Sequence, residues 1–487
     1  DFDCDGATGT AVAVRGLRLL GARRVSYRVP HRIEHGYGLS TALVESMQGM
    51  APDLVLTVDS GIACLAGVAA AKARGWDVII SDHHLPGEAL PAADAIVNPN
   101  LEGDAFPSKA LAGVGVVFYL LLALRRRLRD GGERGGEADL STLLDLVAVG
   151  TVADLVPLDY NNRLLVSAGL KRLRQGQGSE GLRALAEVAG RRLDQLTASD
   201  IGFGLAPRIN AAGRLEDMAV GIECLLADTP ARARELASLL DSINSERREL
   251  QQQMVDEADA LVARWPAPDG GLPAALCLFD PGWHPGVVGL VASKLKERLH
   301  RPVLAFAPSD EGSELLRGSA RSIPGFHMRD ALAAVDARHP ALIPRFGGHA
   351  MAAGLSLPLS AFDAFCEAFQ AHAQASLDAN LLAQEIASDG RLDAHELSRD
   401  TAWALRLAGP WGQGFPEPVF DDTFEVIEWR VLGERHLKLS LRAEGRLAPL
   451  SAIHFGGWDG RPPAERTHLA FQLELDDFRG RNDIQLL

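Results

Sequence analysis

The sequence predicts a multidomain α/β protein with a parallel sheet near its N-terminus and a small β-rich domain at its C-terminal end. A chain of 487 residues is too long for one hydrophobic core. Over roughly the first 160 residues, short apolar runs alternate with helical patterns, which is typical of a parallel sheet covered on both faces. After residue 415 the pattern changes to short alternating strands, which indicates a small β-barrel or sandwich.

The first of these regions contains short strands separated by helices. Helices are expected at 10–20 and 62–73, and the long apolar stretch 111–124 is interpreted as a buried helix. Strands are expected at 25–29, 54–58, 78–80 and 95–97, and the run 143–152, which is apolar throughout, is interpreted as a further strand.

Aspartates follow three of these apolar runs. Asp59, Asp82 and Asp154 each come just after the end of a run. Ligands of open α/β sheets bind at the carboxyl ends of the strands, so these side chains are expected at one edge. Residues 1–5 would join them if a strand precedes residue 1.

The rest of the chain suggests three further segments. Residues 230–266 are strongly helical, without an internal glycine or proline, and predict a connecting helix about 50 Å long. A second α/β pattern follows, with strands at 274–279, 303–306, 315–319 and 350–357 and helices at 287–299 and 361–377. The last segment carries strands at 425–432, 437–441 and 469–475. The expected domains are therefore 1–229, 230–266, 267–388 and 389–487.

Composition narrows the class of protein. The net charge of −15 argues against a protein that coats duplex DNA, but it allows a nuclease with a local basic groove. The five cysteines form no CxxC pair, which argues against a zinc cluster or a disulfide scaffold and fits a reducing cytoplasm. No apolar run reaches the roughly 18 residues that cross a membrane.

Four acidic or histidine-containing motifs predict a metal centre. They are DFDCDGATGT (1–10), VDSG (58–61), SDHHLP (81–86) and GTVADLVP (150–157). One such stretch alone could be a solvated acidic turn, but four at one sheet edge favour hard divalent cations. Mixed Asp and His ligands favour Mn²⁺, with Mg²⁺ as the alternative. The carboxylates are too many for one cation with open positions, so two metals and hydrolysis of a phosphoester or phosphoanhydride are expected.

These four motifs, in this order, resemble those of the DHH phosphoesterase superfamily. Four further segments resemble its bacterial single-strand-specific 5′→3′ exonucleases: RINAAGRL (208–215), WHPGVVGLVASKL (283–295), GSARSIPGFH (318–327) and FGGHAMAAGL (346–355). The resemblance implies a DHH catalytic domain, a long connecting helix, a DHHA1-type domain and a C-terminal OB-like β-barrel. It also implies a two-metal exonuclease that releases 5′-mononucleotides from single-stranded DNA in repair and recombination.

The resemblance assigns roles to residues of the first domain. Metal ligands are expected among Asp1, Asp3, Asp5, Asp59, Asp82, His83 and Asp154. Two of the first three aspartates would ligate, and only Asp3 is common to both alignments. Asp59 matches a bridging carboxylate, and Asp82 is either a ligand or a partner that orients histidine. The catalytic residues would be Asp59, His83, His84 and Asp154, with His84 contacting the phosphate and protonating the leaving oxygen.

Substrate contacts are expected from both α/β domains. The candidates are Arg32, Arg208, Asn210, Arg214, Ser319, Arg321, Gly347, Gly348 and His349. Ser319 and Arg321 would form a pocket for the 5′-terminal phosphate, with Arg32 as a further candidate. The arginines of RINAAGRL could instead form ordinary surface ion pairs. In the OB-like segment, the residues available to a single strand are Trp411, Phe415, Trp429, Arg430, Lys438 and Arg442.

Partners and rival functions follow from the same resemblance. The expected partners are single-stranded DNA with a 5′ end, a helicase and a single-strand-binding protein, in the cytoplasm and without a membrane. The alternatives are another enzyme of the superfamily (an oligoribonuclease, a cyclic-dinucleotide phosphodiesterase or a pyrophosphatase) or a non-catalytic replication scaffold. The small-molecule enzymes would need neither the long helix nor the β-rich tail.

Overall fold

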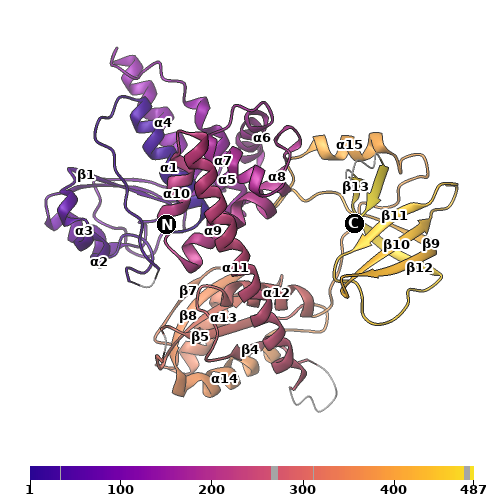
Figure 1. Cartoon of the computed structure of the whole chain (residues 1–487). Coiled ribbons are helices and arrows are strands. Elements are labelled where there is room, and N and C mark those ends of the chain that lie inside the picture. Colours follow the sequence, from indigo (N-terminus) through magenta and orange to yellow (C-terminus); the bar gives the residue numbers. More distant parts are fainter. Residues whose placement is uncertain (33, 265–271, 311, 477–482) are drawn as a thin grey trace. The chain divides into compact units, whose positions relative to one another are not determined.

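The computed structural model describes residues 1–32, 34–264, 272–310, 312–476 and 483–487 (Figure 1). The chain forms two compact units: Asp1–Asp241 together with Ile386–Leu487, called unit 1, and Ser242–Glu385, called unit 2. In the part of the chain that the structure describes, no helix is both long and apolar enough to cross a membrane.

Unit 1 begins with a small parallel sheet. Its strands are β1 (Leu54–Val58), β2 (Asp77–Ser81) and β3 (Ala95–Val97), in the order β1-β2-β3. These three strands confirm the sequence prediction. The helices α2 (Thr41–Ser46) and α3 (Leu65–Ala73) contribute to a hydrophobic core shared with β1 and β2.

Two other expectations for this region are wrong, and a third is confirmed with a different start. Residues 25–29 form no strand, and the apolar run 143–152 lies in helix α5 (Leu144–Ala153), so Asp154 follows a helix. The helix expected at 10–20 begins earlier, as α1 (Cys4–Leu19). An unbroken apolar run fits a fully buried helix as well as a buried strand, and its periodicity cannot separate the two.

The helices of unit 1 form the largest core of the protein. The helix α1 contacts α4 (Gly113–Asp130), α5 and α10 (Ala219–Leu226), and its Ala7, Ala11 and Val12 are fully buried. The other helices are α6 (Tyr160–Arg174), α7 (Glu180–Val188), α8 (Ala198–Asp200) and α9 (Ala206–Leu215). A side chain at Gly150 of α5 would place its Cβ 2.2 Å from Thr8 Oγ1, so this glycine permits α1 and α5 to approach closely.

The helix α11 (Pro230–Ala263) runs without interruption for 34 residues. At 1.5 Å per residue it is about 50 Å long. Its first residues belong to unit 1 and its later ones to unit 2.

Unit 2 contains a mixed five-stranded sheet in the order β4-β5-β6-β8-β7. The strands are β4 (Leu276–Phe279), β5 (Val303–Pro308), β6 (Leu315–Arg321), β7 (Arg345–Gly348) and β8 (Ala352–Pro358). The helices α13 (Met328–Arg338) and α14 (Phe362–Ser376) pack with Phe306 and Leu355 on one face. The helix α12 (Val288–Leu299) packs against β5 and β6. The strand β7 was not expected, because half of its four residues are glycine.

The C-terminal part of unit 1 is a six-stranded β-domain preceded by α15 (Arg399–Ala408). Its strands are β9 (Phe420–Leu432), β10 (His436–Arg442), β11 (Leu450–His454), β12 (Arg466–Phe471), β13 (Leu473–Asp476) and β14 (Asp483–Leu486). Their order is β12-β9-β10-β11-β14-β13, with β11 and β14 parallel. The strands expected at 425–432 and 437–441 are confirmed, and the one expected at 469–475 is divided between β12 and β13.

Candidate metal centre

Asp59 occupies a strained position at the end of β1. Its φ of 56° lies in the left-handed region, which a residue other than glycine rarely adopts. The backbone amide of Asp59 donates to Ser81 O at 3.0 Å, and the side chain is buried. A Cβ on Gly113 would lie 2.5 Å from Asp59 Cβ, so Gly113 makes room for this aspartate.

The three N-terminal aspartates lie at the start of α1. Asp3 caps that helix by accepting a hydrogen bond from Gly6 N at 2.9 Å. Asp5 is buried and accepts hydrogen bonds from Gly113 N (2.6 Å) and Val114 N (2.9 Å), at the N-terminus of α4. The partial positive charge of that helix terminus stabilises a carboxylate here.

Asp82 comes directly after β2, and both of its carboxylate oxygens accept hydrogen bonds. Its Oδ1 accepts hydrogen bonds from the amides of His83 (2.7 Å) and His84 (3.1 Å) and contacts His84 Nδ1 at 2.7 Å. Its Oδ2 accepts one from Ile62 N at 2.9 Å. Burial opposes ionisation, but the bonds from His84 and the backbone outweigh it and lower the pKa of Asp82. Its geometry therefore suits orienting His84.

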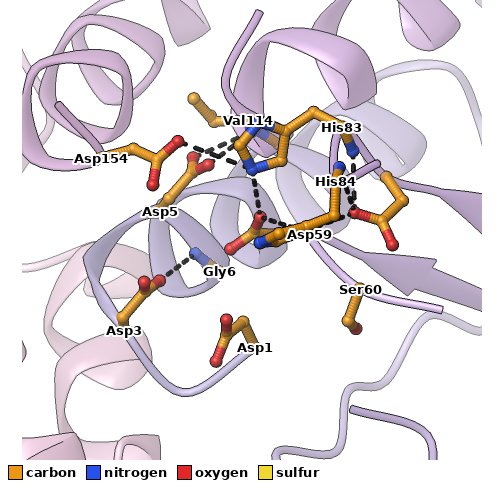
Figure 2. A network of polar contacts seen from close by, with 12 residues as sticks. Asp1, Asp3, Asp5, Gly6, Asp59, Ser60, His83, His84, Val114 and Asp154 are labelled. Carbon is orange, nitrogen blue, oxygen red and sulfur yellow. Dashed lines mark hydrogen bonds and ion pairs between the residues drawn. The ribbon is translucent and has the colours of Figure 1, made fainter. Parts of the chain in front are cut away.

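Asp5, Asp59 and Asp154 converge on His83 (Figure 2). His83 Nε2 lies 3.1 Å from Asp59 Oδ1 and 3.5 Å from Asp154 Oδ2. Among the described residues, none of these three buried atoms has a hydrogen-bond partner. Buried polar atoms without hydrogen bonds are costly, so three such atoms that converge indicate a site that can hold a cation.

Three overlapping groups have ligand atoms within 4.8 Å of one another: Asp59, His83 and His84; Asp5, His83 and Asp154; and Asp1, Asp3 and Asp59. Asp59 and His83 each belong to two groups. Such sharing suits a pair of cations with a common ligand, and the oxygen and nitrogen donors fit Mn²⁺ or Mg²⁺. Asp82 is the one predicted ligand outside these groups in the described part of the chain.

The pKa values of the buried aspartates also indicate a cation site. Burial, and then the charges of Asp5 and Asp3, raise the pKa of Asp59 well above its ordinary value. Burial and the charge of Asp5 raise the pKa of Asp154 to about 9. Burial also raises the pKa of Asp5. Divalent cations would relieve this repulsion and allow every carboxylate to ionise.

Sequence reasoning missed three residues that support the histidines. Asn98 Nδ2 donates to His84 O at 2.8 Å, and Asn100 Nδ2 donates to His83 O at 2.6 Å. The hydroxyl of Tyr37 lies 3.4 Å from His84 Nε2. A signal existed for the asparagines, since VNPN (97–100) begins at the last residue of β3, near the sheet edge that carries Asp59 and Asp82.

The segment RINAAGRL, in α9, braces the first motif. Asn210 Oδ1 accepts from Cys4 N at 2.8 Å. A Cβ on Gly213 would lie 1.9 Å from Phe2 O, so the absence of a side chain at Gly213 permits α9 to contact the backbone of the first motif. Arg32 donates to Gly213 O at 3.0 Å, and its guanidinium lies 4.2 Å from the centre of the Phe2 ring.

The two arginines of this segment differ. Arg208 donates to Asp241 Oδ1 at 2.9 Å and to Gly204 O at 2.6 Å, and its side chain is mostly buried. The ion pair that the sequence left open as an alternative is therefore present. Arg214 is half-buried near the C-terminal end of the same helix.

The remaining candidates lie in unit 2. Arg321 Nη1 donates to Ser319 Oγ and to Ala320 O, each at 2.9 Å. A Cβ on Gly289, in the first turn of α12, would lie 2.8 Å from Ser319 Oγ and 2.9 Å from Arg321 Nη2. Burial lowers the pKa of Arg321. A half-buried guanidinium beside a helix N-terminus suits a phosphate.

The glycine motif shares a sheet face with this pair. Ser319 and Gly347 both pair with Gly354 of β8, the strand between β6 and β7. Gly348 has a φ of 145°, and a Cβ there would lie 2.4 Å from Ala352 O. The backbone amide of the next residue, His349, donates a hydrogen bond to Ala352 O at 2.8 Å.

The aromatic residues of the β-domain fall into two pairs. Trp429 is 40% exposed and stacks on Trp458, with ring centres 5.5 Å apart. Trp411 and Phe415 stack on each other, and the Arg163 guanidinium covers Phe415 at 4.1 Å. Trp429 therefore presents its ring to solvent, while Trp458, Trp411 and Phe415 are half-buried. Arg442 is paired with Glu425 at 2.9 Å.

Comparisons with known proteins agree with this architecture. Three family models match the chain: "DHH family, N-terminal domain" at residues 1–151, "DHHA1 domain" at 271–375 and "RecJ OB domain" at 388–487. The single-stranded-DNA-specific exonuclease RecJ of Dickeya dadantii is 52% identical over the whole chain, which spans 85% of that protein.

Two solved structures are similar over the full length of the chain. RecJ of Thermus thermophilus in complex with Mn²⁺ has a TM-score of 0.80 at 34% identity, and the chain covers 67% of it. The Mg²⁺ complex from the same organism has a TM-score of 0.75 at 31% identity, with 66% of that chain covered.

Proposed function

The chain belongs to the RecJ family of single-stranded-DNA-specific exonucleases, and we propose that it hydrolyses single-stranded DNA from the 5′ end, releasing 5′-mononucleotides in repair and recombination. The observation that carries the proposal is the convergence of three buried ligand atoms, on Asp59, His83 and Asp154, that have no hydrogen-bond partner among the described residues. Ligand groups that share Asp59 and His83 are what a two-cation phosphodiesterase requires.

Asp1, Asp3, Asp5, Asp59, His83 and Asp154 would hold two divalent cations, Mn²⁺ or Mg²⁺. When bound, the cations would activate a water molecule at neutral pH and neutralise charge on the phosphate. Asp82 accepts a hydrogen bond from His84 Nδ1 at 2.7 Å and fixes the orientation of the ring. His84 Nε2 could then donate a proton to the leaving oxygen.

The 5′→3′ direction of degradation would come from the pocket formed by Ser319 and Arg321. A half-buried guanidinium beside the N-terminus of α12 would bind the 5′-terminal phosphate, and so the enzyme would act on ends. The exposed ring of Trp429, backed by the half-buried Trp458, would stack on bases without reading their sequence.

The direct test uses single-stranded DNA labelled at its 3′ end, incubated with the full chain and Mn²⁺. We expect progressive shortening from the 5′ end and release of mononucleotides, with little action on blunt duplex. Pyrophosphate, cyclic dinucleotides and short oligoribonucleotides serve as competing substrates. Turnover of these alone would assign the chain to another activity, and no turnover of any substrate would favour a scaffold.

The Arg321→Ala variant tests the proposed pocket for the 5′-terminal phosphate. Removing the guanidinium should raise KM about tenfold for 5′-phosphorylated strands and much less for 5′-hydroxyl strands, since a charged hydrogen bond is worth about 1.5–3 kcal/mol. Steady-state kinetics with the two substrates measure both values of KM. Equal losses for the two substrates would remove Arg321 from the terminal pocket.

In the cell, the protein would work in the cytoplasm with two protein partners. A helicase would supply single strands, and a single-strand-binding protein would hold them open. The five cysteines, all reduced in the structure, suit a reducing cytoplasm. Co-purification of the full chain with either partner, with and without nuclease treatment, tests for direct contacts.

A further inference from the structure

Leu155, the residue after the candidate ligand Asp154, has an unusual backbone conformation. The helix α5 ends with Asp154 as its C-terminal cap, and Leu155 follows with a φ of 59°, in the left-handed region. Many helices end on a residue in this conformation, but the position favours glycine because a Cβ crowds the backbone there. Of the six non-glycine residues with a positive φ in the described part of the chain, Leu155 is the only one with a large apolar side chain.

The fold does not compensate for this strain by burying the leucine. Leu155 is 71% exposed, whereas Val156 and Leu158 of the same segment pack into the largest core. An apolar side chain that stays in water gains little from the hydrophobic effect on folding. A strained residue that breaks a local sequence rule without a gain in packing is typical of a functional position.

The position of Leu155 is tied to the candidate metal centre through Asp154. The carboxylate of Asp154 lies 3.5 Å from His83 Nε2, and it belongs to the ligand group of Asp5, His83 and Asp154. Consecutive Cα atoms are about 3.8 Å apart, so the exposed leucine lies at the edge of this group. A phosphate held at the centre would bring its neighbouring sugar and base close to the leucine, and leucine is among the apolar side chains that pack against bases.

We propose that Leu155 packs on the base of the second nucleotide of the strand, on the 3′ side of the phosphodiester that is hydrolysed. The proposal rests on the proposed function for the identity of the substrate. Release of a 5′-mononucleotide requires the bond between the first and second nucleotides to lie at the cations. The 5′-terminal phosphate of the first nucleotide belongs to the proposed pocket in unit 2, so the second nucleotide is the one left to unit 1, which contains Leu155. An apolar contact with the face of a base does not depend on its identity, which suits degradation of any sequence.

The test compares two single strands that differ only at the second nucleotide, which carries a base in one and a stable abasic analogue in the other. Both carry a radiolabelled 5′-phosphate and a 3′-fluorophore, and the full chain removes the first nucleotide under single-turnover conditions with Mn²⁺. For the complete strand, Leu155→Ala should raise the half-saturating enzyme concentration about tenfold, because the contact buries much of a leucine side chain. The maximal rate should change by less than about twofold, because the contact serves binding. For the abasic strand, wild type and Leu155→Ala should have the same half-saturating concentration.

Three further variants control for effects on the fold. Leu155→Met keeps a long apolar side chain and should behave like wild type with both strands. Leu19→Ala is the matched loss of an exposed leucine, at the end of α1 that is remote from Asp3, and it should change neither strand's half-saturating concentration. Leu155→Gly should melt at or above the temperature of wild type, because the backbone favours glycine at this position.

An equal rise in half-saturating concentration for both strands in Leu155→Ala would overturn the proposal, since the effect would then not depend on the base. An unchanged concentration for the complete strand would overturn it as well. A lower melting temperature of Leu155→Gly would give the leucine a structural role and would also count against the proposal. If wild type cleaves neither strand, the proposed nuclease fails. Dissociation constants of the same strands, measured by fluorescence anisotropy in Mn²⁺, then decide whether Leu155 contacts the base.

Discussion

Asp59 combines backbone strain, burial and a shared ligand position in one residue. Its left-handed backbone places the carboxylate between the two groups of ligands that also contain the N-terminal aspartates and His83. Strain of this kind costs about 1–3 kcal/mol and persists where the surroundings enforce it. At Asp59 the enforcement comes from Ser81 O and the bare Cα of Gly113.

Asp59→Ala should reduce turnover by about three orders of magnitude or more, equivalent to about 4 kcal/mol of activation barrier. Binding of single-stranded DNA should remain within a few-fold, because in the proposed site this carboxylate would hold cations and would not contact the strand. Single-turnover rates and fluorescence anisotropy measure the two effects. Retained turnover in a normally folded variant would contradict a two-cation site.

Asp154 gives the metal-free protein a characteristic pH dependence. Its folded pKa of about 9 lies above the ordinary 3.8, so its contribution to stability is fully present below about pH 4 and is lost as the pH rises towards 9. The melting temperature in EDTA should therefore fall between pH 5.5 and 8.5, and Asp154→Asn should flatten the fall.

The exposed Asp130 supplies the control for this pH experiment, because Asp130→Asn removes the same charge from a site that solvent reaches. Its melting curve should follow wild type at each pH. An Asp154→Asn variant with the wild-type slope would show that this carboxyl titrates normally in the folded protein.

Among the elements, the loop 409–415 links the β-domain to the segment that follows Asp154. Leu158 N donates to Gln413 O at 2.7 Å, and the Arg163 guanidinium covers Phe415. A Cβ on Gly412 would lie 2.8 Å from Leu158 Cδ1. The loop therefore packs directly on residues that follow a candidate ligand closely in the chain.

Gly412→Val should displace Leu158 and weaken Mn²⁺ binding by about 10-fold, the order of effect seen when the support of a ligand is lost. Isothermal calorimetry of the metal-free protein measures this change. Gly49→Val is the matched control, since a Cβ at Gly49 has nothing within 4 Å. Equal Mn²⁺ affinity in both variants would mean that the loop does not position Asp154.

Across the whole molecule, every candidate ligand among the described residues belongs to unit 1. A ligand that binds only the folded form stabilises the part of the protein that holds it. Mn²⁺ should therefore slow hydrogen exchange in α1, α5 and the loops after β1 and β2, and leave β4 to β8 of unit 2 unchanged. Mass spectrometry with and without Mn²⁺ checks this, and equal protection in both units would argue against a centre confined to unit 1.

The α/β class, the strands β1 to β3, the long helix α11 and the acidic and histidine motifs could all be predicted from the sequence. Each is encoded locally, by apolar runs, by a stretch free of glycine and proline, or by residue types that hard metals prefer. Contacts within the folded protein decide that residues 144–153 form a helix, that Asp82 orients His84, and that Arg208 forms an ion pair with Asp241. These outcomes depend on partners distant in the chain or on competition for hydrogen bonds.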